Sequence, residues 1–194
     1  DLEPESKVQD FIVLTADASA TGVVQMPDSS APPFTVTVSL YSDEGVGRRT
    51  AIDPADGSFT LQLPNGSYKV AVHAEDPGYL GPVVAPVTLP ENGSLDLGTL
   101  TLLPRDALIS GLLTSGGLPV GGIPLVAWRP GAPGTLRTTS APDGTYSLAV
   151  SEGVWHIQPA PTAEQPYLYT GAGQDVQLIP GQALADINFE LLAA

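Results

Sequence analysis

Acidic side chains gather at several turn-like segments of the sequence, where they could coordinate a metal ion. Asp53 and Asp56 lie three residues apart in the segment DPADGSF, and the pairs Asp43-Glu44 and Glu75-Asp76 add further carboxylates. Loops rich in oxygen ligands can hold Ca²⁺. The segment lacks the alternate-position ligand spacing of an EF-hand loop, however, and carboxylates in turns are commonly solvated. We therefore expect no metal and no other cofactor, with a calcium site at Asp53 and Asp56 as the alternative.

Aromatic side chains in the second half of the chain could bind a ligand by stacking. The sequence places Arg129 directly after Trp128, and Tyr167 and Tyr169 flank a leucine. An aromatic ring offers its π face to the apolar face of a sugar ring or to a peptide side chain. One hypothesis is that Trp128, Arg129, Tyr167 and Tyr169 recognise a glycan or a peptide. The competing interpretation assigns the same aromatics to a hydrophobic core and its rim.

The residues needed for catalysis do not occur in a recognisable pattern. The chain has no cysteine, which excludes thiol catalysis, thiolate metal ligands and disulfides. No Gly-x-Ser-x-Gly elbow accompanies a histidine and an acid, and no metalloprotease pair of histidines is present. The sequence therefore predicts that the chain is not an enzyme.

The charge balance narrows the classes of partner. A net charge of −14, from seven basic and twenty-one acidic residues, disfavours nucleic acid and anionic membranes, which attract clustered Lys and Arg. The sequence shows no apolar run long enough for a transmembrane helix and no secretory signal pattern. Since small eukaryotic extracellular domains tend to be rich in disulfides, the lack of cysteine points to a secreted or cell-surface protein of bacterial origin.

The elements that must position these residues are strands. Apolar residues alternate with a period of two, as in Phe34-Val36-Val38-Leu40 and Phe59-Leu61-Leu63, and no stretch sustains a helical period. Twenty prolines, twenty-one glycines and several Asn-Gly and Asp-Gly pairs divide the chain into short segments. This pattern predicts an all-β fold.

The sequence also repeats itself. Residues 50–70 resemble residues 138–157, with Asp143-Gly144 answering Asp56-Gly57 at an offset of 87 (143 − 56 = 87). An earlier match, Gly111 with Gly22, has an offset of 89 (111 − 22 = 89). The same offset of 89 aligns 11–14 with 100–103, and 189–192 looks like a third copy of that strand. We expect two sandwich domains, 17–104 and 105–194, preceded by 1–16 as the last strand of an earlier repeat or an added edge strand.

The repeated motif resembles the carboxypeptidase regulatory-like and Cna B-type families, which share a prealbumin-like β-sandwich. The motif is Asp-Gly, an aromatic residue, alternating apolar residues, and then Gly-x-aromatic-x-Val. In the first copy its residues are Asp56-Gly57-Ser58-Phe59, Leu61, Leu63, Gly66, Tyr68 and Val70. In the second they are Asp143-Gly144-Thr145-Tyr146, Leu148, Val150, Gly153, Trp155 and Ile157. The resemblance implies two tandem Ig-like, Greek-key sandwiches, with Trp155 as a structural residue beside the core.

Cna B-type domains often carry an internal cross-link between a lysine of the first strand and an Asx of the last. Asx candidates are Asp10, Asp96, Asp186 and Asn188. The only lysines, Lys7 and Lys69, lie outside the expected first strands at 21–24 and 109–113. The sequence departs from the family here, which predicts that neither domain forms the cross-link.

Repetition, charge and missing catalytic motifs together favour a non-catalytic spacer or stalk that supports adhesion or presents another domain of the same polypeptide. The alternative is a carbohydrate- or peptide-binding module, in which the aromatics of the second repeat contact a glycan or a protein surface. A spacer would bury its aromatics, whereas a binding module would expose them as a coplanar pair in one domain.

Overall fold

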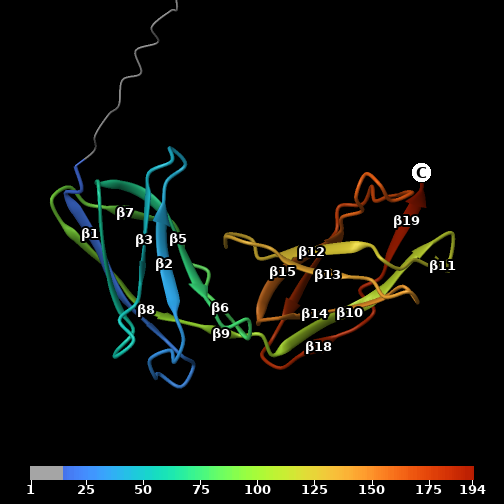
Figure 1. Cartoon of the computed structure of the whole chain (residues 1–194), viewed down its shortest axis with the longest axis horizontal. Coiled ribbons are helices and arrows are strands. Elements are labelled where there is room, and N and C mark those ends of the chain that lie inside the picture. Colours follow the sequence, from blue (N-terminus) through green and yellow to red (C-terminus); the bar gives the residue numbers. More distant parts are fainter. Residues whose placement is uncertain (1–14) are drawn as a thin grey trace, which may run out of the picture.

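The computed structural model describes residues 15–194, and in that range every regular element is a β-strand (Figure 1). The prediction of an all-β chain is therefore confirmed. Buried apolar side chains form two separate hydrophobic clusters, one from residues 18–102 and one from residues 107–191. We call the strands around the first cluster unit 1 and those around the second unit 2. The strand expected at residues 11–14 lies outside the described residues.

Unit 1 is a sandwich of two sheets. One sheet has the order β4-β1-β8, and the other has the order β3-β2-β5-β7. A further pair, β6 with β9, lies beside them. The strands are β1 (Ala18–Gln25), β2 (Val36–Tyr41), β3 (Gly47–Ala51), β4 (Ser58–Leu63), β5 (Gly66–Ala74), β6 (Tyr79–Leu80), β7 (Val87–Leu89), β8 (Ser94–Thr101) and β9 (Leu103–Pro104).

Unit 2 repeats this arrangement. Its first sheet centres on β10, which pairs with β14 on one side and with β18 and β19 on the other, and its second sheet has the order β13-β12-β15-β17. The strands are β10 (Ala107–Ser115), β11 (Leu118–Pro119), β12 (Pro124–Trp128), β13 (Leu136–Thr139), β14 (Thr145–Val150), β15 (Gly153–Pro159), β16 (Tyr167–Leu168), β17 (Gln174–Leu178), β18 (Ala183–Leu184) and β19 (Phe189–Ala193).

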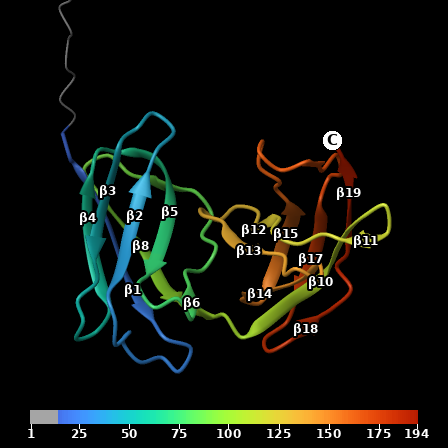
Figure 2. The same cartoon turned by 45° about the vertical axis from the view of Figure 1, so that its right-hand side comes forward.

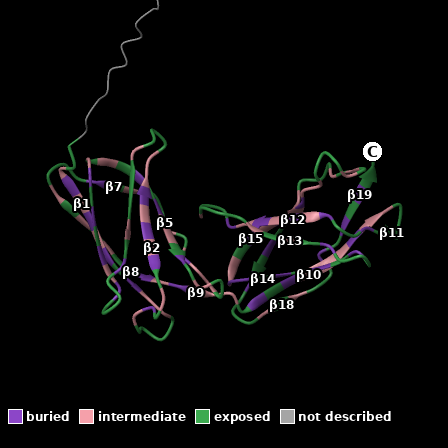
Figure 3. Ribbon diagram, viewed as in Figure 1, coloured by how far each residue is buried: buried purple, intermediate pink, exposed green. Residues whose placement is uncertain are grey.

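The period of two in the sequence decides which side chains fill each core. Along β2, Val36, Val38 and Leu40 are fully buried, while the residues between them are partly exposed. Figure 3 shows the same alternation of buried and more exposed residues along β2. Successive side chains of a strand point to opposite faces, so each sheet turns its apolar residues toward the other sheet.

The Asp-Gly motif builds the same turn in both units. Gly57 and Gly144 have φ angles of 77° and 78°, in the left-handed region that favours glycine. Each glycine carbonyl accepts a hydrogen bond from the first strand, from Val24 N (2.9 Å) in unit 1 and from Leu113 N (2.8 Å) in unit 2. The motif therefore anchors the start of the following strand, β4 or β14, to the first strand of its unit.

The second aromatic residue of the motif, Tyr68 or Trp155, is a hydrogen-bonded core residue in both units. The hydroxyl of Tyr68 donates to the carbonyl oxygen of Pro64 (3.0 Å), and Nε1 of Trp155 donates to that of Ser151 (2.9 Å). Both rings are almost completely buried, at 4% and 2% exposure. Burial raises the pKa of the Tyr68 hydroxyl. Trp155 is thus a core residue, as the resemblance implied.

In each unit the first strand lies beside and parallel to the last strand of the two main sheets, β1 beside β8 and β10 beside β19. Val24 pairs with Leu100, and Leu113 pairs with Phe189. In unit 1 the register shifts between Thr21 and Val23, because β8 has two residues where β1 has only Gly22, and this forms a bulge. In unit 2 the segment that joins β18 to β19 likewise has one more residue than the part of β10 around Gly111. A Cβ on Gly111 would lie 2.0 Å from the carbonyl oxygen of Ile187, so this glycine makes room for the backbone of that segment.

Candidate functional site

Trp128 lies on the outer face of the second sheet of unit 2. It pairs with His156 of β15, which in turn pairs with Asp175 of β17, so the three side chains form a row across the sheet. The Trp128 and His156 rings are 4.3 Å apart and tilted by 38°, and Nδ1 of His156 lies 2.6 Å from Oδ1 of Asp175. The row is a partly exposed polar and aromatic surface that could contact a ligand.

Tyr167 and Tyr169 lie elsewhere, on the segment that contains β16. Both pack against the core of unit 2. The Tyr169 ring meets the Phe189 ring edge-on at 5.7 Å, and its hydroxyl accepts a hydrogen bond from Gly173 N (3.0 Å). Both tyrosines also line an open cavity of about 420 Å³, which Trp128 does not reach. They do not form a coplanar pair with Trp128.

Arg129 is buried between the two units, with 8% exposure. It comes directly after the end of β12 and is buried like Leu125 and Ala127, which alternate with more exposed residues along that strand. Its guanidinium lies over the Trp155 ring at 5.5 Å, and Nη2 donates to the carbonyl oxygen of Gly81 in unit 1 (2.6 Å). Nη1 is buried without a hydrogen-bond partner, and burial lowers the pKa of this guanidinium from its ordinary value. The structure thus places Arg129 at the contact between the units and separates it from the outward-facing Trp128.

The carboxylates proposed as calcium ligands are engaged within their own turn. Oδ1 of Asp53 accepts a hydrogen bond from Ala55 N (2.9 Å), and Oδ1 of Asp56 accepts one from Ser58 N (2.8 Å). The bond from Ser58 N lowers the pKa of the Asp56 carboxyl. Among residues 15–194, no three His, Asp or Glu side chains lie together as a metal site would require.

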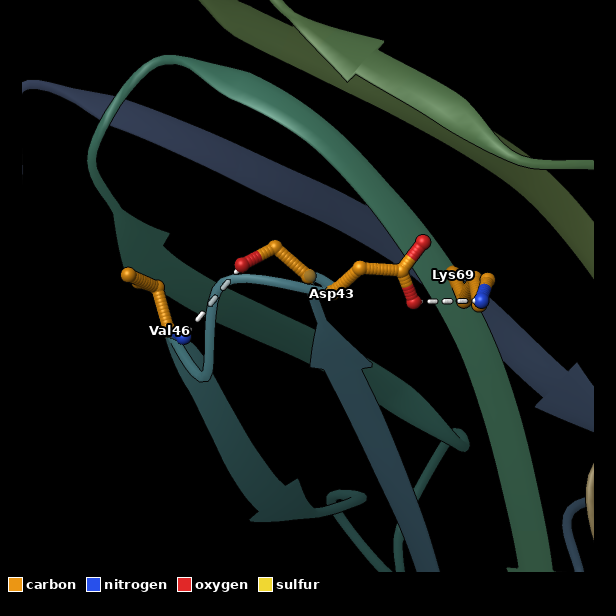
Figure 4. Close-up of polar contacts among 4 residues, drawn as sticks. Asp43, Val46 and Lys69 are labelled. Atoms are coloured by element: carbon orange, nitrogen blue, oxygen red, sulfur yellow. Dashed lines mark hydrogen bonds and ion pairs between the residues drawn. The ribbon is translucent and has the colours of Figure 1, made fainter.

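Lys69 lies on β5, away from the first strand of unit 1. Its Nζ is 2.5 Å from Oδ1 of Asp43 in the β2–β3 loop, where Ser42 Oγ also accepts a hydrogen bond from Val46 N (3.2 Å) (Figure 4). The hydrogen bond to Asp43 raises the pKa of the lysine, whose side chain is half exposed. The first strands β1 and β10 contain no lysine. Lys7 and Asp10 lie outside the described residues.

A second arginine joins the units at the link between them. From Arg105, Nη1 donates to the carbonyl oxygen of Pro77 in unit 1 (2.9 Å), while Nε and Nη2 donate to that of Ala149 in unit 2 (3.1 and 2.7 Å). Its backbone N–H donates to Gly78 (2.8 Å). A planar guanidinium with several fixed donors suits such a bridge between two surfaces.

The two residues of β6 also connect the units. This strand pairs with β9, the last strand before Arg105, through Tyr79 with Pro104 and Leu80 with Leu103. Tyr79 packs against the core of unit 1, whereas Leu80 packs against the core of unit 2. Figure 1 shows β6 and β9 between the two sandwiches, and Figure 2 shows β6 there from another direction. The link is therefore a paired and packed segment.

A cavity of about 360 Å³ lies at this junction. Unit 1 contributes Val72, Ala74, Tyr79 and Leu80, and unit 2 contributes Arg129 and Trp155 together with the loop between β12 and β13. We call the set Tyr79, Leu80, Arg105 and Arg129 the junction residues. Two of the five arginines in the chain are junction residues. Because basic residues are so few in this acidic chain, each arginine was a candidate for a specific contact, and this was the sequence signal for the junction.

Comparison with known proteins finds similar solved structures, all at low sequence identity. No protein-family model and no curated protein matches the sequence. Among solved structures, the minor pilin GBS52 of Streptococcus agalactiae is 13% identical with a TM-score of 0.49, and the match covers 91% of this chain and 96% of that one. A streptococcal ancillary pilin is 13% identical, with a TM-score of 0.46 and coverage of 91% and 62%. The Bacillus anthracis TIE protein is 11% identical, with a TM-score of 0.43 and coverage of 91% and 34%. This chain therefore spans about a third of the TIE protein and less than two thirds of the ancillary pilin.

Proposed function

We propose that the chain is a non-catalytic spacer of a secreted or cell-surface bacterial protein, which holds another domain of the same polypeptide at a fixed distance and direction. The observation that carries this proposal is the junction. Hydrogen bonds from Arg105 reach both units, Arg129 donates across the interface, and Leu80 of unit 1 packs on the core of unit 2. A spacer needs such a contact, because two sandwiches joined by a loose linker would not keep a fixed direction.

The resemblance to carboxypeptidase regulatory-like and Cna B-type domains supports the same proposal through its repeated motif. We further propose that 17–104 and 105–194 are two domains, each folding around its own hydrophobic cluster. The helices required to span a membrane do not occur among residues 15–194.

The spacer proposal is tested by measuring how far apart the two units are held. Because the chain has no cysteine, spin labels can be attached at Glu91→Cys in unit 1 and Arg137→Cys in unit 2, both at exposed positions. Double electron–electron resonance is expected to give one narrow distance distribution. The double variant Leu80→Asp, Arg105→Ala should broaden it, while Arg49→Ala, an exposed arginine of β3, should leave it unchanged. A broad distribution in the unmodified chain contradicts the proposal.

A second candidate function is the recognition of a glycan or a peptide by unit 2. The specific observation in its favour is the row of Trp128, His156 and Asp175 on the outer face of the sheet. The test is a glycan array and a peptide array, each probed with the original chain and with Trp128→Ala. Binding that disappears in the variant would support this function, and the same weak signal from both chains would count against it.

A further inference from the structure

The C-terminal end of unit 2, which lies on the side away from unit 1 (Figure 1), repeats the strand pair by which unit 1 meets unit 2. In unit 1, β6 (Tyr79–Leu80) pairs with β9 (Leu103–Pro104). In unit 2, β16 pairs with the end of β19 in the same register, Tyr167 with Ala193 and Leu168 with Leu192. Tyr167 packs against the core of its own unit, as Tyr79 does. The sequence Tyr-Leu thus occupies the same place in both units.

The two leucines differ in what covers them. Leu80 packs against the core of the next unit, and Leu103 beside it is half-buried. Their counterparts Leu168 and Leu192 are 54% and 53% exposed. Two large apolar side chains paired across neighbouring strands at the surface usually mark an interface. The equivalent pair in unit 1 is Leu80 and Leu103, and the partner that Leu80 contacts is the core of the next sandwich.

The cavities at the two ends correspond as well. Unit 1 lines its share of the junction cavity with Val72 and Ala74 of β5 and with Tyr79 and Leu80. The cavity of about 420 Å³ at the far end of unit 2 is lined by the corresponding residues Pro159, Pro161, Tyr167 and Leu168. At the junction, the β12–β13 loop of unit 2 completes the cavity wall. At the far end, all the residues that line the cavity belong to unit 2, and none of them comes from a β12–β13 loop.

We propose that the surface formed by Tyr167, Leu168, Leu192 and the 420 Å³ cavity is a docking site for a further sandwich unit of the same kind as unit 2, joined covalently after β19. Its β12–β13 loop would enter the cavity, and its core would cover Leu168 as the core of unit 2 covers Leu80. A covalent link is favoured because the contact between units 1 and 2 is made within one chain, across a link in which β9 is followed directly by Arg105. Such a tether supplies a high effective concentration, so that a small contact suffices.

The proposal differs from the spacer function, since a rigid pair of units does not require a third. It does make a distinct prediction for a longer chain.

The test uses the full chain extended by a second copy of residues 105–194, joined after Ala193 so that Arg105 of the copy takes the place of Ala194. Spin labels at Arg137→Cys in unit 2 and at the same position in the added unit report the new contact. In a second sample of the extended chain, labels at Glu91→Cys in unit 1 and Arg137→Cys in unit 2 report the original junction.

The expected result is a narrow distance distribution between unit 2 and the added unit. Leu168→Asp in unit 2 should broaden that distribution and leave the one between units 1 and 2 narrow. The matched control Ser147→Asp, at an exposed position in the middle of β14, adds the same charge away from the surface and should change neither. Because Leu168 is exposed, the variant should fold, and an unchanged melting temperature of the two-unit chain checks this.

A broad distribution between unit 2 and the added unit, insensitive to Leu168→Asp, would overturn the docking proposal while the original junction still reported a rigid pair. A broad distribution at the original junction would instead contradict the spacer function. The two failures are therefore distinguishable in one set of samples.

Discussion

At the scale of single residues, the repeated motif is explained by backbone geometry. Asp56-Gly57 and Asp143-Gly144 recur because a glycine must adopt a positive φ where another strand passes close by. A Cβ on Gly57 would lie 2.0 Å from the carbonyl oxygen of Val24. The acidic residue before each glycine accepts the N–H two residues later, from Ser58 or Thr145. Residues that could have been ligands are thus used to close a turn.

Gly57→Ala is expected to destabilise the chain much more than Gly45→Ala. Both glycines have a positive φ, of 77° and 84°, but a Cβ on Gly45 would meet no atom within 4 Å. Gly45→Ala should cost roughly 1 to 2 kcal/mol of unfolding free energy from backbone strain alone. Gly57→Ala adds a steric conflict with β1 and should cost roughly 2 to 5 kcal/mol. Urea unfolding of the two variants measures the difference, and equal losses would show that close approach to Val24 is unimportant.

Asp143 should make the stability of the chain sensitive to acid. Its carboxylate accepts hydrogen bonds from Thr145 Oγ1 (2.6 Å) and Thr145 N (3.1 Å), and these lower its pKa in the folded state. The pKa in the unfolded chain is about 3.9. The stabilisation is therefore complete above that value and is lost as the pH falls through the lower folded pKa.

The measurement is the melting temperature of the original chain and of Asp143→Asn as a function of pH. The variant should melt at a lower temperature at pH 6, and the two chains should converge toward pH 2. A difference that stays constant across this range would show that the carboxylate charge does not contribute.

At the scale of strands, the face on which a residue lies decides its role. Trp128 and Arg129 are neighbours in sequence, but Trp128 at the end of β12 lies on the outer face, whereas Arg129 directly after it is buried at the junction. The alternating apolar pattern allowed the strands and much of each core to be predicted from sequence. It could not locate the junction, because Arg129 donates to a carbonyl oxygen of unit 1 and Leu80 packs on the core of unit 2. No local pattern around either residue encodes a contact with a different unit.

The two tryptophans should respond very differently to truncation. Trp155→Ala removes a ring that is 2% exposed, together with its hydrogen bond to Ser151, and should cost about 3 to 5 kcal/mol of unfolding free energy. Trp128→Ala removes a ring on the outer face that stacks on His156 and should cost about 1 kcal/mol. Denaturant unfolding of both variants provides the comparison. A large loss for Trp128→Ala would indicate that the outer face is packed more tightly than the structure shows.

At the scale of the whole molecule, the two units should be free of covalent cross-links and independent of metal. We predict that the intact mass equals the mass calculated from the sequence, because no first strand carries a lysine. A deficit of one ammonia or one water for each unit would show this prediction to be wrong.

Addition of calcium or of a chelator is predicted to leave the melting temperature unchanged, because Asp53 and Asp56 are engaged in their own turn. A ligand that binds the folded state at 100 times its Kd would stabilise it by about 2.7 kcal/mol, which a thermal scan would detect. A calcium-dependent rise that Asp53→Asn abolishes would establish the alternative.

The parallel pairing of the first and last strands has a mechanical consequence. In unit 1 the chain enters at Ala18, at one end of β1, and leaves at Thr101, at the opposite end of its neighbour β8. A force that pulls the two ends apart would therefore slide β1 along β8, and it would load their hydrogen bonds together instead of opening them one after another. Unit 2 has the same geometry between β10 and β19. Each sandwich is thus built to resist stretching along the line that joins its ends.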